Sequence, residues 1–274
     1  MSKLLLLLFL AVFHFACGSS GSITESKPEP PRAADQLAQF SSAGHAHYVG
    51  ARYDSACFYL EKARAIDHHE PRVLMELGES YYAMGMELPN GTQRERNLRM
   101  ALDRYATIDS IGKADAGTYE RLTEVSHLLG DTQLFVHYAE KQAAVHPGDR
   151  ELYNLGLAYF DARNYQKTIE TQKGAIQKYP HSPYIGGFYR LLGDGYYEID
   201  RQQTAERTYQ EGVKVVDSRV ADMKGANSQF STSSEYRQLA DSRRSMLLSL
   251  KKLYRLHGKK KELDEVDRLL EKDP

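Results

Sequence analysis

The stretch Leu155–Phe160 reads Leu-Gly-Leu-Ala-Tyr-Phe, and it is followed by Asn164-Tyr165, then by Ala175 and Pro180. The spacing predicts two helices: a first, aromatic-rich helix with a glycine, and a second helix with a small residue at 175. Small residues where two helices cross let their backbones approach closely. Proline does least harm between helices, because it has no backbone N–H. This stretch therefore predicts a helical hairpin that ends near residue 180.

The same pattern recurs along the chain, which indicates a repeat. Residues 77–82 read Leu-Gly-Glu-Ser-Tyr-Tyr, and residues 192–197 read Leu-Gly-Asp-Gly-Tyr-Tyr. Gly44 has the place of the glycine in a first copy, Thr123 replaces it in a degenerate third copy, and Tyr254 marks a divergent last copy. Each hairpin leaves an apolar face exposed unless a neighbour covers it, so such an array is stable only as a stack.

These residues resemble the tetratricopeptide-repeat family, which has Leu-Gly-x-x-Tyr in the first helix, a small residue in the second helix and a closing proline. The resemblance covers nearly all of residues 37–274. It implies an all-α, right-handed superhelical solenoid of about six helix hairpins. We expect the hairpins at about 37–70, 71–110, 115–147, 149–180, 183–218 and 235–274.

Two polar segments interrupt the pattern. Residues 86–96 contain a Pro-Asn-Gly turn signal inside the second hairpin, and residues 220–234 are Ser-rich and weakly periodic. We expect both to be loops, the second with some helical character. Insertions of this kind often carry specificity in repeat proteins, although passive surface loops are the more common case.

The N-terminus has the pattern of an export signal. Lys3 supplies positive charge, and an apolar run extends from Leu4 to Ala16. This run is shorter than the roughly 20 residues that a transmembrane helix needs. Residues 1–16 therefore read as a secretory signal peptide, which is not part of the mature fold.

The end of this signal resembles the lipobox of bacterial lipoproteins. Ala16-Cys17-Gly18 fits the pattern, although His14 stands where the family usually has an aliphatic residue. In that family the cysteine is acylated, so the resemblance implies a lipid on Cys17; the alternative is an ordinary cleaved signal. Residues 17–36 are rich in Ser, Gly, Pro and Glu, which predicts a flexible tether between the lipid and the solenoid.

The composition and the motifs exclude several function classes. The chain has 36 basic and 37 acidic residues among 274, a formal net charge of −1, so no global field draws it to nucleic acid. It contains no H-E-x-x-H, no Gly-rich phosphate loop and no G-x-S-x-G motif. We therefore expect no enzymatic activity, no cofactor and no nucleic-acid partner.

Isolated His and Cys residues have ordinary structural interpretations. His45 and His47, two positions apart on a helix, cannot face one ligand, and His68-His69 lie in a turn between repeats. We expect no metal site. Cys57 follows a small crossing residue, where a buried apolar role is more common than a reactive thiol.

The resemblance also implies a binding surface. In this family the first helices line the concave face, and the residue after the motif tyrosine points into it, whereas the motif tyrosine itself packs inside. Tyr82 and Tyr197 should therefore face the groove while Tyr81 and Tyr196 face the core. The full set of expected groove residues is Tyr48, Glu79, Tyr82, Glu124, His127, Phe160, Asp194 and Tyr197.

The resemblance to the repeat family and the lipobox-like N-terminus together suggest a scaffold protein of the bacterial envelope. Lipoproteins of this repeat family and size act as assembly factors for secretins, outer-membrane proteins, murein synthesis or the Tol-Pal system. We expect a protein-binding scaffold held by its lipid in the bacterial envelope, on the periplasmic face of the outer membrane, with other envelope proteins as partners. The alternative is a lipid-anchored module that delivers a small ligand to a transporter.

Overall fold

The computed structural model describes residues 32–226 and 230–271. This part of the chain contains twelve α-helices, one 3-10 turn at Phe230–Thr232, and no strand, which confirms the all-α prediction. The helices are α1 (Ala33–Val49), α2 (Tyr53–Ile66), α3 (Pro71–Glu87), α4 (Thr92–Ser110), α5 (Ala116–Leu128), α6 (Thr132–Val145), α7 (Asp149–Asp161), α8 (Tyr165–Lys178), α9 (Ile185–Glu198), α10 (Gln202–Ala226), α11 (Ser234–Leu256) and α12 (Lys260–Glu271).

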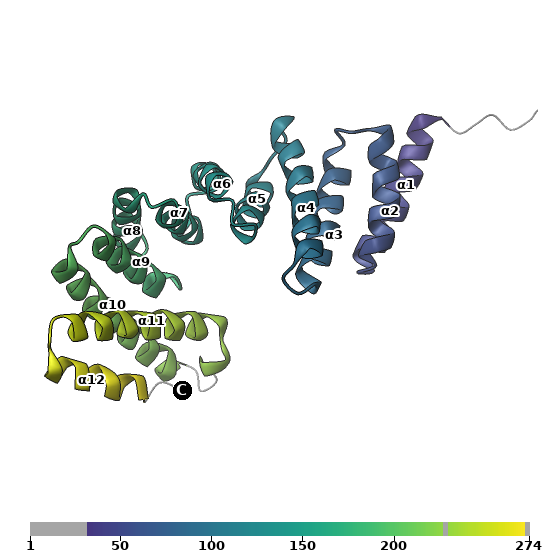
Figure 1. Cartoon of the computed structure of the whole chain (residues 1–274). Coiled ribbons are helices and arrows are strands. Elements are labelled where there is room, and N and C mark those ends of the chain that lie inside the picture. The colour runs from purple at the N-terminus through teal and green to yellow at the C-terminus, as the bar shows by residue number, and fades with distance from the viewer. Residues whose placement is uncertain (1–31, 227–229, 272–274) are drawn as a thin grey trace, which may run out of the picture.

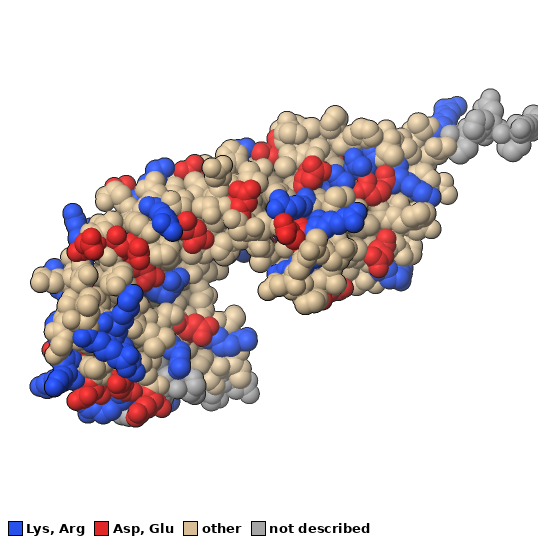
Figure 2. Space-filling view, in the orientation of Figure 1, with Lys and Arg blue, Asp and Glu red and all other residues tan. Residues whose placement is uncertain are grey.

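Successive helices pair into six hairpins, and each hairpin packs on the next to form a curved solenoid (Figure 1). The chain starts at α1 and runs through α8 as an arch. The long helices α10 and α11, together with α12, then fold back beneath α7 and α9 as a C-terminal lobe. The space-filling view shows a hollow between this lobe and the α3–α4 end of the arch (Figure 2). No helix in the described ranges is long and apolar enough to cross a membrane.

Glycines explain how closely the two helices of a hairpin approach. A Cβ atom added at Gly44, Gly78, Gly156 or Gly193 would come within 3.0 Å of one side chain on the second helix of the same hairpin. Each glycine thus makes room for a larger residue from the partner helix. The residues that lie over these glycines are, in the same order, Leu60, Tyr105, Gln172 and Tyr209.

In the third hairpin the larger residue of the crossing pair is on the first helix and the smaller one is on the second helix. Thr123 stands in the glycine position of α5 and is only 1% exposed. In three of the other hairpins the large partner lies sixteen residues further along (44 and 60, 156 and 172, 193 and 209). The same spacing from Thr123 leads to Ala139, which is fully buried. A larger residue on the first helix is therefore matched by a smaller one on the second, which explains how a degenerate copy still packs.

The core is a series of aromatic-rich clusters, and the largest of them ties together α8 to α12. Tyr196 and Tyr209 belong to this cluster and are almost completely buried. Val220 and Met223, near the end of α10, pack against it as well. The last two hairpins therefore form the most continuously packed part of the solenoid.

Both predicted loops are shorter than expected. The segment 86–96 is a loop only at residues 88–91, because Gly91, at φ 153°, directly precedes α4, and Glu95 pairs with Arg99 one turn later. The segment 220–234 is helical as far as Ala226, and Ser233 caps α11 by accepting a hydrogen bond from the backbone N–H of Tyr236. The first loop was predicted too long, whereas the helical character expected of the second segment is confirmed. Polar residues with good helix propensity extend helices whose apolar stripe is sparse.

The N-terminal predictions fall mostly outside the described residues. The expected signal peptide at 1–16, Cys17 and the tether as far as residue 31 lie there. Helix α1 begins at Ala33, four residues before the expected start of the solenoid at 37.

Candidate partner-binding groove

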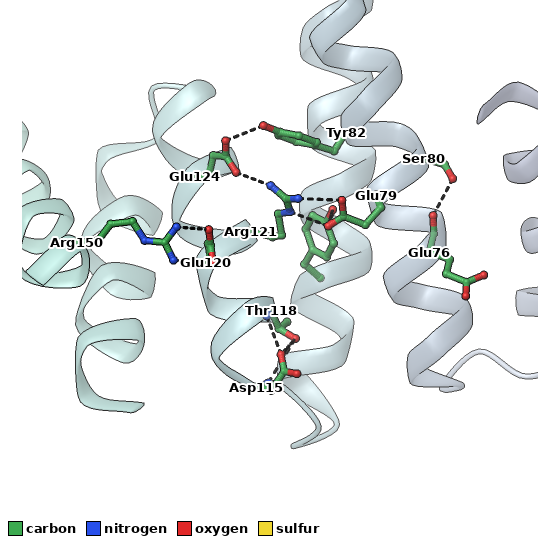
Figure 3. A network of polar contacts seen from close by, with 11 residues as sticks. Glu76, Glu79, Ser80, Tyr82, Asp115, Thr118, Glu120, Arg121, Glu124 and Arg150 are labelled. Atoms are coloured by element: carbon green, nitrogen blue, oxygen red, sulfur yellow. Dashed lines mark hydrogen bonds and ion pairs between the residues drawn. The ribbon is translucent and has the colours of Figure 1, made fainter. Parts of the chain in front are cut away.

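Three of the expected groove residues meet around one arginine (Figure 3). Arg121 of α5 makes a two-pronged ion pair with Glu79 of α3: Nε lies 2.7 Å from Oε1 and Nη2 lies 3.1 Å from Oε2. Its remaining nitrogen, Nη1, donates to Glu124 Oε2 at 2.9 Å. The Tyr82 hydroxyl donates to Glu124 Oε1 at 2.6 Å, and the Arg121 guanidinium lies over the Tyr82 ring. The arginine thus joins the second and third hairpins.

This network changes the expected role of its members. Glu79, Tyr82 and Glu124 were expected to face the groove, and each is also bonded to a neighbouring hairpin. Burial, and then the hydrogen bond to Glu124, raises the pKa of Tyr82 to about 12. Burial lowers the pKa of Arg121, but its two carboxylates outweigh this effect and hold it above its usual value. The arginine therefore stays charged, and the carboxylates serve the solenoid as well as the groove.

A recess of about 290 Å³ lies beside this network, between α5 and α7. Its floor is apolar: Phe135 is 3% exposed, and the His127 ring stacks on it with ring centroids 4.6 Å apart. His127 Nε2 lies 3.6 Å from Asp161 Oδ2. We call this surface the α5–α7 recess; it is lined by Glu120, Arg121, Thr123, Glu124, His127, Phe135, Arg150, Asn154 and Leu157.

A second recess, of about 230 Å³, lies on the other side of α7. It brings together three expected groove residues, Phe160, Asp194 and Tyr197, with side chains from α10 and α11. We call it the α9–α11 recess; it is lined by Phe160, Asp194, Tyr197, Glu198, Tyr209, Ser249 and Lys252.

Asp194 is the most buried acid of this second recess. Tyr209 donates its hydroxyl to Asp194 Oδ1 at 2.6 Å, and Arg190 Nη1 lies 2.9 Å from Oδ2. Burial raises the pKa of the Asp194 carboxyl, and the two donors offset this only in part. The carboxylate is therefore held in the recess at an energetic cost.

The remaining expected residues have different surroundings. Tyr197 is half-buried, and Lys252 Nζ lies 4.6 Å from the centre of its ring. Tyr48 lies at the N-terminal end of the solenoid, where its ring packs near Tyr53. Five of the eight expected residues thus line the two recesses. Glu79 and Tyr82 belong to the Arg121 network beside the first recess, and Tyr48 lines neither recess.

Sequence reasoning missed the cations and phenols that hold the acidic residues. Arg121 could have been paired with Glu124, which lies one turn away on the same helix. Its second partner, Glu79, is 42 residues distant, and no sequence pattern indicates that contact. Tyr105 donates to Glu79 across the same hairpin, because Gly78 leaves room for its ring. The available sequence signal for the contact between Tyr105 and Glu79 was Gly78, because a glycine at a helix crossing indicates a large residue on the facing helix.

The described part of the chain offers no other obvious chemistry. Across residues 32–226 and 230–271, no three His, Cys, Asp or Glu side chains come close enough together to hold a metal ion. Cys57 is buried, with its sulfur 3.9 Å from that of Met84. Burial raises the pKa of the Cys57 thiol to about 12, which is unfavourable for a nucleophile.

Comparison with known proteins gives a fold and no family. No protein-family model matches the chain, and no curated protein matches it. Among solved structures, a crystal structure of MamA aligns with a TM-score of 0.56 at 16% identity, covering 69% of this chain and 96% of that one. MamA from Desulfovibrio magneticus RS-1, residue 41 to its end, aligns at 0.52 and 17% identity, with 69% and 99% covered. MamA MSR-1 aligns at 0.51 and 19%, with 68% and 98% covered. At these identities the likeness concerns architecture alone: the chain has a tetratricopeptide-like α-solenoid fold.

Proposed function

We propose that this protein is an interaction scaffold, held in the bacterial envelope by a lipid on Cys17, that binds segments of partner proteins along its concave face. The observation that carries the proposal is the pair of recesses on either side of α7. Leu157 lines one and Phe160 lines the other, one helical turn apart. A segment lying across α7 could therefore place one side chain in each recess.

The structural features of these recesses suit recognition of a polypeptide. Each combines aromatic floor residues with charged side chains at its edge, a combination that gives both affinity and specificity in protein interfaces. The alternative function, delivery of a small ligand to a transporter, calls for a deep apolar pore. Both recesses are lined largely by charged and polar residues, so they do not favour that alternative.

The lipid anchor rests on the sequence of residues 1–36. Several acyl chains on one cysteine hold a protein stably on a membrane, whereas a single chain holds it only marginally. Cys17→Ala should therefore release the protein from the membrane fraction. Fractionation of cells with a salt wash measures this. A variant that stays in the washed membrane pellet would show that the anchor is not Cys17.

Binding in the groove is tested with two adjacent tyrosines of α9. Tyr197 is half-buried and faces the α9–α11 recess, whereas Tyr196 is 6% exposed and belongs to the core. Tyr197→Ala should leave the melting temperature nearly unchanged while weakening partner binding by about 2 kcal/mol, or roughly 30-fold, as aromatic hot spots do. Tyr196→Ala should lower stability by about 3 kcal/mol, as large-to-small core changes do.

The assay is capture of partners from cross-linked envelopes, with thermal melting of each variant alongside. Tyr197 is the better probe than Tyr82, because loss of the Tyr82 hydroxyl would also break the bond to Glu124. If Tyr197→Ala captures the same proteins in the same yield as the unchanged chain, the concave face is not the binding surface.

A further inference from the structure

The α5–α7 recess lies in a region with more carboxylates than cations. Arg121 is shared between Glu79 and Glu124, as described above. Arg150 is shared in the same way: its Nη1 and Nη2 lie 2.7 and 2.9 Å from the two oxygens of Glu120, and its Nε lies 3.4 Å from Glu151 Oε1. Two guanidinium groups are thus shared among four carboxylates, which gives this connected group a net excess of two negative charges (Figure 3 shows three of the four carboxylates).

The remaining basic side chain in the lining does not offset this excess. His127, the other basic side chain of the recess, lies 3.6 Å from a further carboxylate, that of Asp161. Arg121 and Arg150 line the recess beside Glu120 and Glu124, but each guanidinium is also bonded to a further carboxylate, Glu79 or Glu151, so the local field remains negative. The recess therefore favours a positively charged occupant and disfavours an anion.

A buried hydroxyl in the recess wall gives an independent indication of an occupant. Thr123 is 1% exposed, and its Oγ1 has no hydrogen-bond partner within the described chain. Buried polar groups in folded proteins are nearly always hydrogen-bonded, so an orphan of this kind calls for an explanation. Thr123 lines the recess, and a donor placed there would pair with it.

The lining of the recess indicates which kind of cation would fit it. This lining combines apolar surface from Phe135 and Leu157 with the carboxylates of Glu120 and Glu124, which Arg150 and Arg121 bind. A lysine side chain matches this arrangement, because its aliphatic stem covers apolar surface while its ammonium seeks polar partners. An ammonium group has three donors in a compact volume, enough for a hydroxyl and two carboxylates.

We propose that the α5–α7 recess binds the side chain of a lysine from a partner protein, with the ammonium donating to Thr123, Glu120 and Glu124. The identity of the source as a partner protein rests on the proposed function. The preference of the recess for an alkylammonium group does not, since it follows from charge and the orphan hydroxyl.

The test uses the full chain in detergent and the short peptide Ac-Gly-Gly-Lys-Gly-Gly-NH2. Matched peptides carry norleucine or glutamate in place of the lysine, and n-butylammonium serves as a free amine. Binding is followed by NMR through the methyl signals of Thr123 and Leu157. The lysine peptide should shift both signals at millimolar concentration, the norleucine peptide should bind at least about tenfold more weakly, and the glutamate peptide should not bind.

Thr123→Val supplies the decisive variant, because valine keeps the shape of threonine and removes the hydroxyl. It should weaken the lysine peptide several-fold and leave the norleucine peptide unchanged. Glu124→Gln should also weaken the lysine peptide, whereas Glu198→Gln, in the other recess, should not. Raising the salt concentration should weaken binding of the lysine peptide alone, a readout that does not depend on any variant folding normally.

Several results would overturn the proposal. Equal binding of the three peptides would show that the recess does not select a cation. An unchanged affinity in Thr123→Val would remove the role of the hydroxyl. Failure of n-butylammonium to shift either methyl signal would show that the alkylammonium group is not what the recess recognises. None of these results bears on capture through Tyr197, so the inference and the proposed function fail separately.

Discussion

The two recesses beside α7 occupy equivalent places in neighbouring repeats, yet their charges are arranged differently. In the α5–α7 recess and its bonded neighbours, two arginines face four carboxylates. In the α9–α11 recess, Asp194 and Glu198 are matched by Arg190, paired with Asp194, and by Lys252 over Tyr197. The repeat therefore supplies the hollow, and a few charged positions decide what each hollow favours.

The two recesses also differ at the helix crossing beneath them. Gly193 lies under the ring of Tyr209 in the α9–α11 recess, and this phenol in turn holds Asp194. Thr123 has the equivalent place in the α5–α7 recess and brings a hydroxyl instead of a gap. Gly193 leaves room for Tyr209 of the second helix, whose hydroxyl is then the polar group at the crossing. Thr123 instead supplies a hydroxyl from the first helix.

The largest effect on stability is expected when the glycine at the α9–α10 crossing is replaced by a larger residue. Gly193→Ala places a Cβ within 3.0 Å of the Tyr209 ring, which is 2% exposed and has little room to move. The overpacking should cost about 1–3 kcal/mol of unfolding free energy. Urea denaturation at neutral pH measures it.

Gly174→Ala is the matched control for this variant. Gly174 is an exposed glycine within α8, with nothing within 4 Å of an added Cβ. Alanine there should stabilise the protein by up to about 1 kcal/mol, because glycine is a poor helix former. If both alanines stabilise, the close crossing at Gly193 is not a packing constraint.

Much of the fold was accessible from the sequence, for a physical reason. Leu-Gly-x-x-Tyr combines a crossing residue and a core aromatic within two turns of one helix, so a local pattern reports a tertiary contact. The compensation of Thr123 by Ala139 was not visible as a rule until the other hairpins showed which residues lie over their glycines. The extent of α10 was missed because its end is stabilised by Val220 and Met223 packing on a distant cluster.

The groove was predicted less well than the fold. The face on which Tyr197 and Asp194 lie follows from helical periodicity, and the structure places both in one recess. The state of each side chain depends on partners far along the chain. Glu79 and Glu124 were expected as groove residues, and only the three-dimensional arrangement shows that Arg121 binds both. Helical periodicity predicts the face on which a side chain lies, but it does not predict which residues of other helices bind that side chain.

A smaller effect is expected in how the stability of the protein depends on pH, through Asp194 in the α9–α11 recess and Asp115 at the start of α5. The pKa of Asp194 is raised above the usual carboxyl value of 3.8, mainly by burial. The folded protein therefore holds that proton more tightly than the unfolded chain, so this residue lowers stability at neutral pH. The penalty disappears as the pH falls through the raised folded-state pKa towards 3.8. Asp115, which caps α5, has the opposite shift: hydrogen bonds from Thr118 lower its pKa, so its contribution is present above about 3.8 and is lost below that value.

The measurement is urea unfolding of the unchanged chain and of Asp194→Asn between pH 7 and pH 4.5, because differences between the two cancel the titration of all other carboxylates. The unchanged chain should gain stability relative to Asp194→Asn as the pH falls across this range, because the folded protein holds the Asp194 proton more tightly than the unfolded chain does. Asp115→Asn should show no such gain, because the folded-state titration of Asp115 lies below the range. A difference that stays flat, or that grows in favour of Asp194→Asn on acidification, would mean that Arg190 and Tyr209 fully offset the burial of Asp194. The acid of the α9–α11 recess would then be as well compensated as a surface ion pair, and the contrast with the α5–α7 recess, where two arginines are shared among four carboxylates, would be sharper still.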